Sequence, residues 1–124
     1  MIVAIDHVQL AMPPGDEARA RDFYWGALGF DEVAKPAELA GRGGCWFEKA
    51  SVRVHLGVEP GFQPARKAHP AFLVKDLALL LAACRERGYV AYGEELRDDV
   101  YRAYIDDPFG NRIELIEARH QEQK

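Results

Sequence analysis

Two stretches decide the fold: SVRVHLGV, residues 51–58, and GNRIELIE, residues 110–117. Each alternates apolar residues with other residues, which is the pattern of a strand with one buried face. Each also carries one ionisable residue near its centre, His55 in the first stretch and Glu114 in the second. The match indicates that the two strands are equivalent parts of one repeated module.

The spacing of the residues before these strands supports an internal repeat. His55 follows Gly29 by 26 positions, and Glu114 follows Gly88 by the same 26. Both glycines end apolar stretches with helical periodicity, where a left-handed residue commonly terminates a helix. A duplicated module accounts for all four positions.

Two more histidines hold matching places before the helices. His7 precedes the first of these glycines by 22 positions, and His69 precedes the second by 19. The turn PPG at 13–15 absorbs the difference of three residues. His7 therefore corresponds to His69, as the central histidine of the first stretch corresponds to the glutamate of the second.

The remaining stretches complete each copy as βαβββ. Strands are expected at 4–12, 31–35, 44–49 and 51–58 in the first copy, and at 69–76, 89–95, 101–106 and 110–117 in the second. Asp16 and Asp76 are expected to cap the two helices. We thus expect one α+β domain over 1–124, with module one at about 1–58, a connection at 59–68, module two at about 69–118 and a polar tail at 119–124.

The composition limits the class of protein. With 124 residues, of which 48% are hydrophobic, the chain suits one folded domain, and no apolar run is long enough to span a bilayer. The N-terminal residues lack the pattern of a signal peptide, so a cytoplasmic location is expected. A net charge of −4 with scattered basic residues argues against a nucleic-acid partner. Cys45 and Cys84 form no CxxC pair and are interpreted as packing residues.

Strand alternation predicts a metal site. His55 and Glu114 each alternate with apolar neighbours that can pack under the helix of their own module. The faces that carry His7, His55, His69 and Glu114 are therefore expected to point into a shared concavity. Alone, each of these residues could be an ordinary core or surface residue. Together they fill the four positions that the repeat makes equivalent in pairs: three of the chain's four histidines stand at three of these positions, and a glutamate stands at the remaining one. His120, in the tail, has no such support.

The expected ligand set limits the metal. Three imidazoles and one carboxylate suit Zn, Ni, Co, Mn or Fe(II) rather than Ca or Mg. One carboxylate leaves a divalent ion with a formal charge of about +1, which favours an anionic ligand bound through two adjacent oxygens. A metal with open positions then acts as a Lewis acid and template.

The chain resembles the vicinal oxygen chelate superfamily, which includes glyoxalase I, methylmalonyl-CoA epimerase, fosfomycin-resistance enzymes and extradiol dioxygenases. The matching stretches are IDHVQLAM, ARDFYWGALGF, VRVHLGV, HPAFLVKDL and IDDPFGNRIELIE, and they cover nearly the whole chain. DPFGNRIELIE is the most specific, since it resembles the closing turn and strand that carry the glutamate ligand. The resemblance implies two βαβββ modules in an open, incomplete β-barrel around a metal-binding cleft, and a homodimer whose cleft can be shared between subunits.

The resemblance also implies roles for single residues. His7 takes the place of the first-strand ligand, His69 that of the ligand opening the second module, and Glu114 that of the last-strand ligand. His55 stands where glyoxalase I has a glutamate and the epimerase a glutamine. Glu114 then remains as the carboxylate that can act as base, while His55 is a ligand, a base or a hydrogen-bond donor to the substrate.

Further residues are expected around the site. The candidates for lining a substrate pocket are Gln9, Trp46, Arg53 and Tyr101, whereas Phe47 is interpreted as core and Arg112 as solvated. Phosphate loops and nucleophile elbows are absent from the sequence.

The expected function is that of a glyoxalase-like metalloenzyme, an isomerase or lyase that acts on a small molecule. Fosfomycin transferases have a ligand triad that resembles His7, His69 and Glu114 of this chain, but they carry threonine where this chain has Gln9. Two alternatives remain open: an extradiol-type dioxygenase with Fe(II) at the same place, and a non-catalytic protein that sequesters a drug or metabolite, like the bleomycin-binding members of this superfamily.

Overall fold

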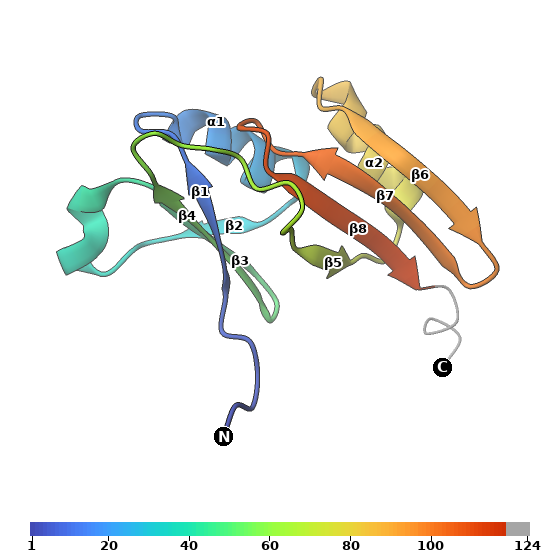
Figure 1. The fold of residues 1–124 in the computed structure, drawn as a ribbon, viewed down its shortest axis with the longest axis horizontal. Helices are drawn as coiled ribbons and strands as arrows, with labels where there is room; N and C mark the ends of the chain where they lie inside the picture. The colour runs from blue at the N-terminus through green and yellow to red at the C-terminus, as the bar shows by residue number, and fades with distance from the viewer. Residues whose placement is uncertain (119–124) are drawn as a thin grey trace. The chain divides into compact units, whose positions relative to one another are not determined.

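Four strands of the N-terminal part form one mixed sheet in the order β1-β4-β3-β2 (Figure 1). They are β1 (Val8–Met12), β2 (Asp31–Val33), β3 (Cys45–Lys49) and β4 (Val52–Val58). β1 runs parallel to β4, and the other neighbouring strands pair antiparallel. The strand that carries His55 therefore lies inside the sheet, paired on both sides.

The C-terminal part repeats this arrangement. Its sheet has the order β5-β8-β7-β6 and is built from β5 (Ala71–Leu73), β6 (Ala91–Arg97), β7 (Val100–Asp106) and β8 (Arg112–Ala118). β5 runs parallel to β8, and the other pairs are antiparallel. The predicted α+β class with two βαβββ modules is confirmed, and within residues 1–118 neither sheet closes into a barrel.

The computed structural model describes residues 1–118, and the chain divides into two compact units, Met1–Pro64 and Ala65–Lys124. The division falls inside the connection predicted at 59–68. The predicted tail, with His120, lies outside the described residues. Within the described part of the chain, no helix is long and apolar enough to cross a membrane.

The register of the parallel strands reproduces the repeat seen in the sequence. The residue of β1 opposite His55 is Gln9, and the residue of β5 opposite Glu114 is Ala71. In each unit a histidine stands two residues before that position. The equivalence inferred from sequence spacing is therefore present in the geometry of the strands.

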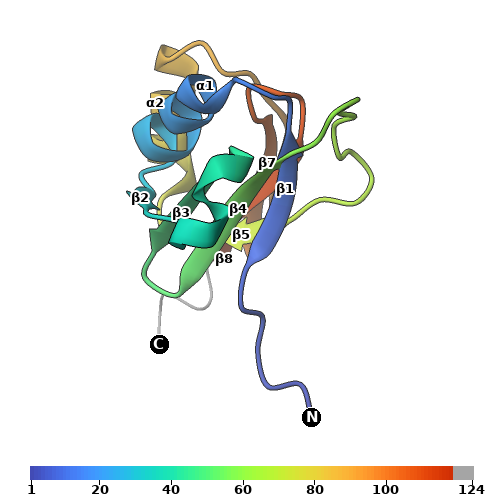
Figure 2. The same cartoon turned by 90° about the vertical axis from the view of Figure 1, so that its left-hand side faces the viewer.

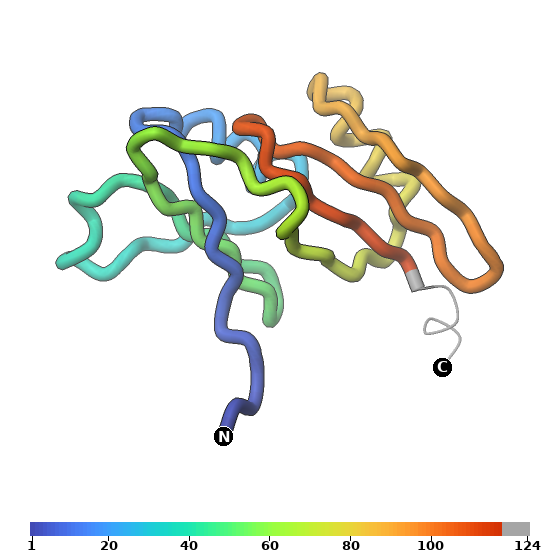
Figure 3. The backbone as a smooth tube through the Cα atoms, in the orientation of Figure 1, coloured from blue at the N-terminus to red at the C-terminus, as the bar shows by residue number. Residues whose placement is uncertain are grey.

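The strands are shorter than predicted beside these two histidines. β1 begins at Val8 rather than at residue 4, and residues 1–6 leave the sheet as an arm (Figure 3). β5 begins at Ala71 rather than at residue 69, because Pro70 has no N–H with which to extend a ladder. Each histidine therefore flanks its strand instead of lying inside it.

The first sheet packs one face against the helical segment that follows β1. This segment is α1 (Glu17–Arg21) followed directly by a π-helical turn, η1 (Asp22–Ala27). Tyr24 of η1 stacks on Phe47 of β3 with ring centroids 5.4 Å apart. The buried apolar residues of this unit are Leu10, Met12, Ala20, Phe23, Tyr24, Ala27, Phe30, Cys45, Phe47, Val54 and Leu56. The interpretation of Phe47 as core is confirmed.

The second sheet packs against one helix, α2 (Leu77–Glu86). Leu77, Leu81 and Cys84 recur at helical spacing and are buried, as are Ala103, Ile105, Ile113 and Leu115 of the sheet. Asp76 caps this helix, because its carboxylate accepts a hydrogen bond of 3.2 Å from the N–H of Leu79. The same prediction for Asp16 is wrong: its side chain makes no cap hydrogen bond and instead pairs with Arg19 at 3.2 Å.

Both cysteines are buried and free, in agreement with a packing role. Burial raises the pKa of each thiol to about 11. They are therefore protonated and unreactive near neutral pH.

A short 3₁₀ helix, η2 (Ala37–Arg42), stands between β2 and β3, in a segment for which the sequence analysis predicted no helix or strand. The glycines follow it: Gly43 and Gly44 have φ of 78° and 85°. A Cβ on Gly44 would lie 2.1 Å from the carbonyl oxygen of Leu56. Glycine at position 44 thus allows the chain to return closely along β4 after η2.

The turn between β7 and β8 fixes the connection that carries His69. Asp107 Oδ1 accepts hydrogen bonds from the N–H groups of Phe109 and Asn111, each at 2.9 Å. The buried Asn111 side chain in turn accepts a hydrogen bond of 2.9 Å from the N–H of Ala65. The stretch DPFGN therefore ties the start of the second unit to the end of its own sheet.

We expect Asn111→Ala to lower the free energy of unfolding by about 1–3 kcal/mol, because the Ala65 N–H and Asp107 Oδ2 lose their partner. Urea unfolding followed by circular dichroism measures this change. Replacing the exposed Gln63 with Ala serves as control and is expected to change stability by less than about 0.5 kcal/mol. Equal stability of Asn111→Ala and the wild type would contradict the role of this turn.

Candidate functional site

Each sheet carries its metal-capable residues on the face turned away from its helix. In the first unit, Gln9 of β1 and Trp46 of β3 lie on either side of His55. In the second unit, Ala71 of β5 and Tyr104 of β7 flank Glu114 in the same way. Each unit therefore builds a pair of candidate ligands, one on the inner strand and one just before the parallel edge strand.

His55 lies in a stack of three rings. The Trp46 ring lies parallel to it, with centroids 3.9 Å apart and an interplanar angle of 3°. From the β1 side the His7 ring stacks on it at 4.0 Å and 17°. Only 6% of His55 remains exposed. Trp46, predicted as a substrate-lining residue, is thus in direct contact with a predicted metal ligand.

The surroundings of His55 favour its neutral form. Burial lowers the pKa of this histidine, and the nearby His7 lowers it further. A neutral imidazole is the form that binds a metal ion. The first unit therefore presents a nitrogen donor that need not lose a proton near neutral pH.

Asp6 orients His7. The Nδ1 atom of His7 lies 2.9 Å from one carboxylate oxygen of Asp6, and Arg53 donates to the other oxygen at 3.1 Å. The hydrogen bond from His7 and the charge of Arg53 lower the pKa of Asp6. A carboxylate at Nδ1 holds the proton there and leaves Nε2 available, which is the arrangement found behind metal-bound histidines. Arg53, predicted to line the pocket, is engaged here with Asp6.

The pair in the second unit is in direct contact. His69 Nε2 lies 3.0 Å from Glu114 Oε1. The other ring nitrogen, Nδ1, faces the carbonyl oxygens of Arg66 and Lys67 at 3.2 and 3.0 Å. Because carbonyls only accept hydrogen bonds, Nδ1 carries a proton. A neutral ring would then turn a lone pair toward the carboxylate, so a proton or a cation has to lie between these two atoms.

Arg102 holds the second oxygen of Glu114. Its Nη1 atom lies 3.2 Å from Oε2 of this carboxylate, and only 9% of Glu114 is exposed. Arg102 Nε also lies 3.2 Å from Glu95 Oε1. Both oxygens of Glu114 thus have a polar partner, His69 at Oε1 and Arg102 at Oε2. The sequence analysis did not identify Arg102.

Tyr104, rather than Tyr101, is the tyrosine beside the second pair. Its ring meets the His69 ring edge-on at 5.7 Å and 86°. Tyr101 lies on the helix side of β7 with Ala103, and its hydroxyl donates to Glu94. Arg112, interpreted as solvated, covers the Tyr104 ring at 5.3 Å.

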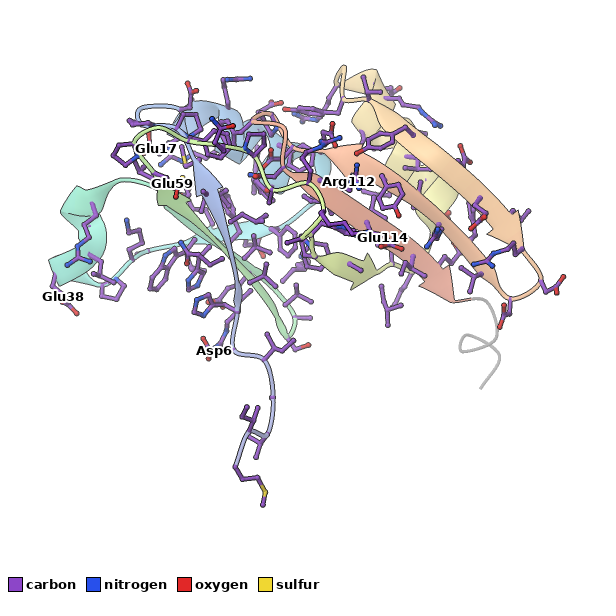
Figure 4. All side chains as sticks on the ribbon, in the orientation of Figure 1. Asp6, Glu17, Glu38, Glu59, Arg112 and Glu114 are labelled. Carbon is purple, nitrogen blue, oxygen red and sulfur yellow. The ribbon has the colours of Figure 1, made fainter. Side chains whose placement is uncertain are left out.

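The residues present suit a divalent metal as two half-sites. Each unit has two side chains that could serve as ligands, His7 and His55 in the first and His69 and Glu114 in the second. His69 and Glu114, whose facing atoms are 3.0 Å apart, would together offer the nitrogen and oxygen ligands that transition metals prefer. Among residues 1–118, no group of three or more His, Cys, Asp or Glu side chains lies close enough together to hold a metal ion. Figure 4 shows Glu114 on β8 and Asp6 beside the arm before β1.

Comparison with known proteins supports the resemblance drawn from the sequence. Residues 4–115 match the family model described as the Glyoxalase/Bleomycin resistance protein/Dioxygenase superfamily. No curated protein sequence matches this chain.

Three solved structures are similar over nearly the full length. A glyoxalase family protein from Bacillus anthracis is 46% identical and is covered over 97% of its length by 95% of this chain, with a TM-score of 0.89. The antibiotic binding protein TnmS3 from Streptomyces sp. CB03234 is 27% identical, with 94% of this chain and 99% of that protein covered and a TM-score of 0.68. FosX, a fosfomycin resistance protein from Listeria monocytogenes, shares only the fold: 16% identity, full coverage of both chains and a TM-score of 0.78.

The lowered pKa of His55 predicts a specific dependence of stability on pH. A histidine whose pKa is lower in the folded chain binds fewer protons there, so folding loses free energy as the pH falls through the ordinary value of 6.5. We expect the wild type to lose more stability than His55→Phe between about pH 7.5 and 5.5. Urea midpoints at several pH values measure this difference. Parallel pH profiles for the two proteins would show that His55 is not held neutral by its surroundings.

Proposed function

This chain belongs to the glyoxalase/bleomycin resistance protein/dioxygenase superfamily, and on that basis we propose that it is a metal-dependent enzyme of the glyoxalase type. It binds a small substrate through two adjacent oxygens on a divalent metal and moves a proton, as an isomerase or a lyase does. The proposed metals are Zn, Ni, Co, Mn and Fe(II). The proposed working form is a cytoplasmic homodimer.

The contact between His69 and Glu114 carries this proposal. Their facing atoms are 3.0 Å apart, and the proton on Nδ1 of His69 is already used for backbone carbonyls. The remaining pair of atoms, a nitrogen lone pair and a carboxylate oxygen, is a donor set for a transition metal. A metal ion can replace the proton between them without any change of tautomer.

We propose that His7 and His55 complete the ligand set, from the same chain or from the second chain of the homodimer. Asp6 supports His7 through Nδ1, and the ring stack with Trp46 limits the rotation of His55. Three neutral nitrogens and one carboxylate then hold the ion. This is the ligand set predicted from the repeat.

The chain's own residues divide the chemistry. When bound, the metal supplies a Lewis acid that polarises two adjacent oxygens. Glu114 is the proposed base, because its carboxyl group is nearly buried and is held by Arg102 at the oxygen that does not face His69. His55 is the second proposed catalytic group, a ligand that can also donate a hydrogen bond to the substrate.

A second candidate is a protein that sequesters a drug or metabolite without turning it over. The 27% identity with an antibiotic binding protein favours this reading. Trp46 and His7, the end rings of the stack around His55, also each have an outer face on which a flat ligand can stack. An Fe(II) dioxygenase would use the same ligands as the proposed isomerase, so only its consumption of oxygen distinguishes it.

Metal uptake is the first test of the proposed function. Protein purified without an affinity tag is expected to bind one Ni, Zn, Co, Mn or Fe(II) ion per chain, measured by elemental analysis and calorimetry. We expect His69→Ala, His7→Ala and Glu114→Gln each to weaken the affinity by about 10- to 100-fold or more, since each removes one donor. His55→Ala decides whether this residue is a ligand.

The fourth histidine provides the control for metal uptake. His120→Ala removes the same kind of side chain from a place with no repeat-equivalent partner, and we expect it to leave the affinity unchanged. Absence of stoichiometric binding by the wild type, for all five metals, would overturn both metalloenzyme readings and leave the sequestering protein.

The reaction is tested with the metal-loaded protein in D₂O. We expect deuterium to enter the carbon next to the carbonyl group of a hemithioacetal or of a 2-substituted acyl thioester, followed by NMR. Glu114→Gln is expected to slow this exchange by about 10²- to 10⁴-fold, because it removes the base. Oxygen uptake by the Fe(II) form in place of proton exchange would identify a dioxygenase instead.

A further inference from the structure

A pocket of about 280 Å³ opens at the end of the first sheet where β3 begins and β4 ends. We propose that this pocket, here called the Lys35–Arg42 pocket, binds the carboxylate-bearing end of an organic anion with an apolar body. The inference deepens the proposed function, on which it rests for the assumption that the anion is the substrate. A second hollow of about 360 Å³, lined by Glu59 and Pro60 among others, shares Gln9, Gly57 and Val58 with it.

The pocket has a defined outer wall. That wall is η2, the teal helical turn between β2 and β3 in Figures 1 and 2. Leu39 and Arg42 of η2 line the pocket, and Gly43 follows them. A Cβ on Gly43 would lie 2.9 Å from Cγ2 of Val58, so glycine lets η2 close directly onto the end of β4.

The floor of the pocket is mainly apolar. Leu39, Leu56 and Val58 contribute aliphatic surface, and Trp46 contributes its ring. Gly57 stands on β4 two residues after His55, on the same face, and any side chain there would occupy the space of Gln9: a Cβ would come within 2.3 Å of its amide nitrogen. The absence of a side chain at position 57 therefore makes room for the Gln9 amide, which lines the pocket.

Two cations line the pocket without a carboxylate among its lining residues. Lys35 is half-buried and donates one hydrogen bond to the carbonyl of Gly43, which leaves two ammonium protons unused. Arg42 is exposed and has no hydrogen-bond or ion-pair partner in the described part of the chain. A guanidinium with free donors beside an ammonium is suited to a carboxylate.

Glu17 offsets part of the charge of Lys35, whereas Arg42 has no such carboxylate in the described part of the chain. Glu17 is committed to the N–H of Gly44 at 2.8 Å, a contact that lowers its pKa and keeps it ionised. Glu38 lies on η2 but points away from the sheet (Figure 4), and Glu59 directly follows β4 and lines the second hollow rather than the pocket itself. Positive charge thus lies at one side of the paired hollows and negative charge at the other, which gives an anionic ligand one preferred orientation.

The pocket is joined to the ring stack by two shared residues. Trp46 lines the pocket and stacks on His55, and Gln9 lines the pocket and lies opposite His55 on β1. A ligand whose carboxylate meets Lys35 and Arg42 can therefore extend its apolar body over Trp46 toward His55. The substrate class that follows is a small organic acid with an apolar segment between its carboxylate and its reacting oxygens.

Calorimetric titration of the metal-free protein tests this inference with two probes, 4-phenylbutyrate and its uncharged amide. The wild type is expected to bind the carboxylate about tenfold or more tightly than the amide, because two charge-assisted contacts are lost in the amide. The double variant Lys35→Gln/Arg42→Gln is expected to lose this preference. Lys49→Gln, which removes an exposed lysine of the same unit paired only with Asp31 at 3.7 Å, is expected to keep it.

A filled pocket gives the second arm. Gly57→Leu places a side chain in the hollow, and with an unchanged circular dichroism spectrum it is expected to lose binding of both probes. Equal affinity for both probes, no binding of either by the wild type, or binding retained in Gly57→Leu would overturn the inference. Because the metal is absent, the result is separate from the proposed function: metal uptake without carboxylate preference rejects this pocket alone, and carboxylate preference without metal uptake rejects only the metalloenzyme.

Discussion

The parallel pairing of the first and last strands of each module fixes the position of the candidate site residues. In a strand, neighbouring side chains point to opposite faces, so a shift of one residue would turn His55 or Glu114 toward the helix. The apolar residues next to them in each strand prevent such a shift. Val54 and Leu56 beside His55 are buried in the core of the first unit, and Ile113 beside Glu114 is buried in that of the second. The burial of one face therefore determines the chemistry of the other.

This constraint explains how far the sequence could predict the fold. The spacing from each helix-ending glycine to the central strand residue is the same in both copies, and the structure confirms the two βαβββ modules. The prediction was less accurate where the chain leaves the regular pattern. η2 has no apolar periodicity that would indicate a helix, and proline at position 70 shortens the strand after His69.

The candidate site residues divide in the same way. Residues on the inner parallel strands were found by their place in the repeat, whereas Arg102, Lys35 and Arg42 act through contacts that depend on hairpin register or on η2. Tyr101 illustrates the difficulty: two residues separate β3 from β4, but five separate β7 from β8. Because of the longer turn, the residue opposite Glu114 is Tyr104, ten positions earlier, whereas the residue opposite His55 is Trp46, nine positions earlier. The equivalence of the two copies therefore shifts by one residue on β7, which places Tyr101 on the helix side and Tyr104 beside Glu114.

The two equivalent strand positions, 55 and 114, carry different kinds of side chain, an imidazole and a carboxyl group. The surroundings of each position account for this difference. Glu114 sits between the His69 ring and the guanidinium of Arg102, which together stabilise an anion that is nearly buried. A carboxylate at position 55 would instead lie between the rings of Trp46 and His7, with Arg53 already bound to Asp6. An unpaired charge buried there would be costly, while a neutral imidazole stacks on both rings. Histidine at position 55 is thus matched to the surroundings in its own unit, as glutamate at position 114 is to those in the second unit.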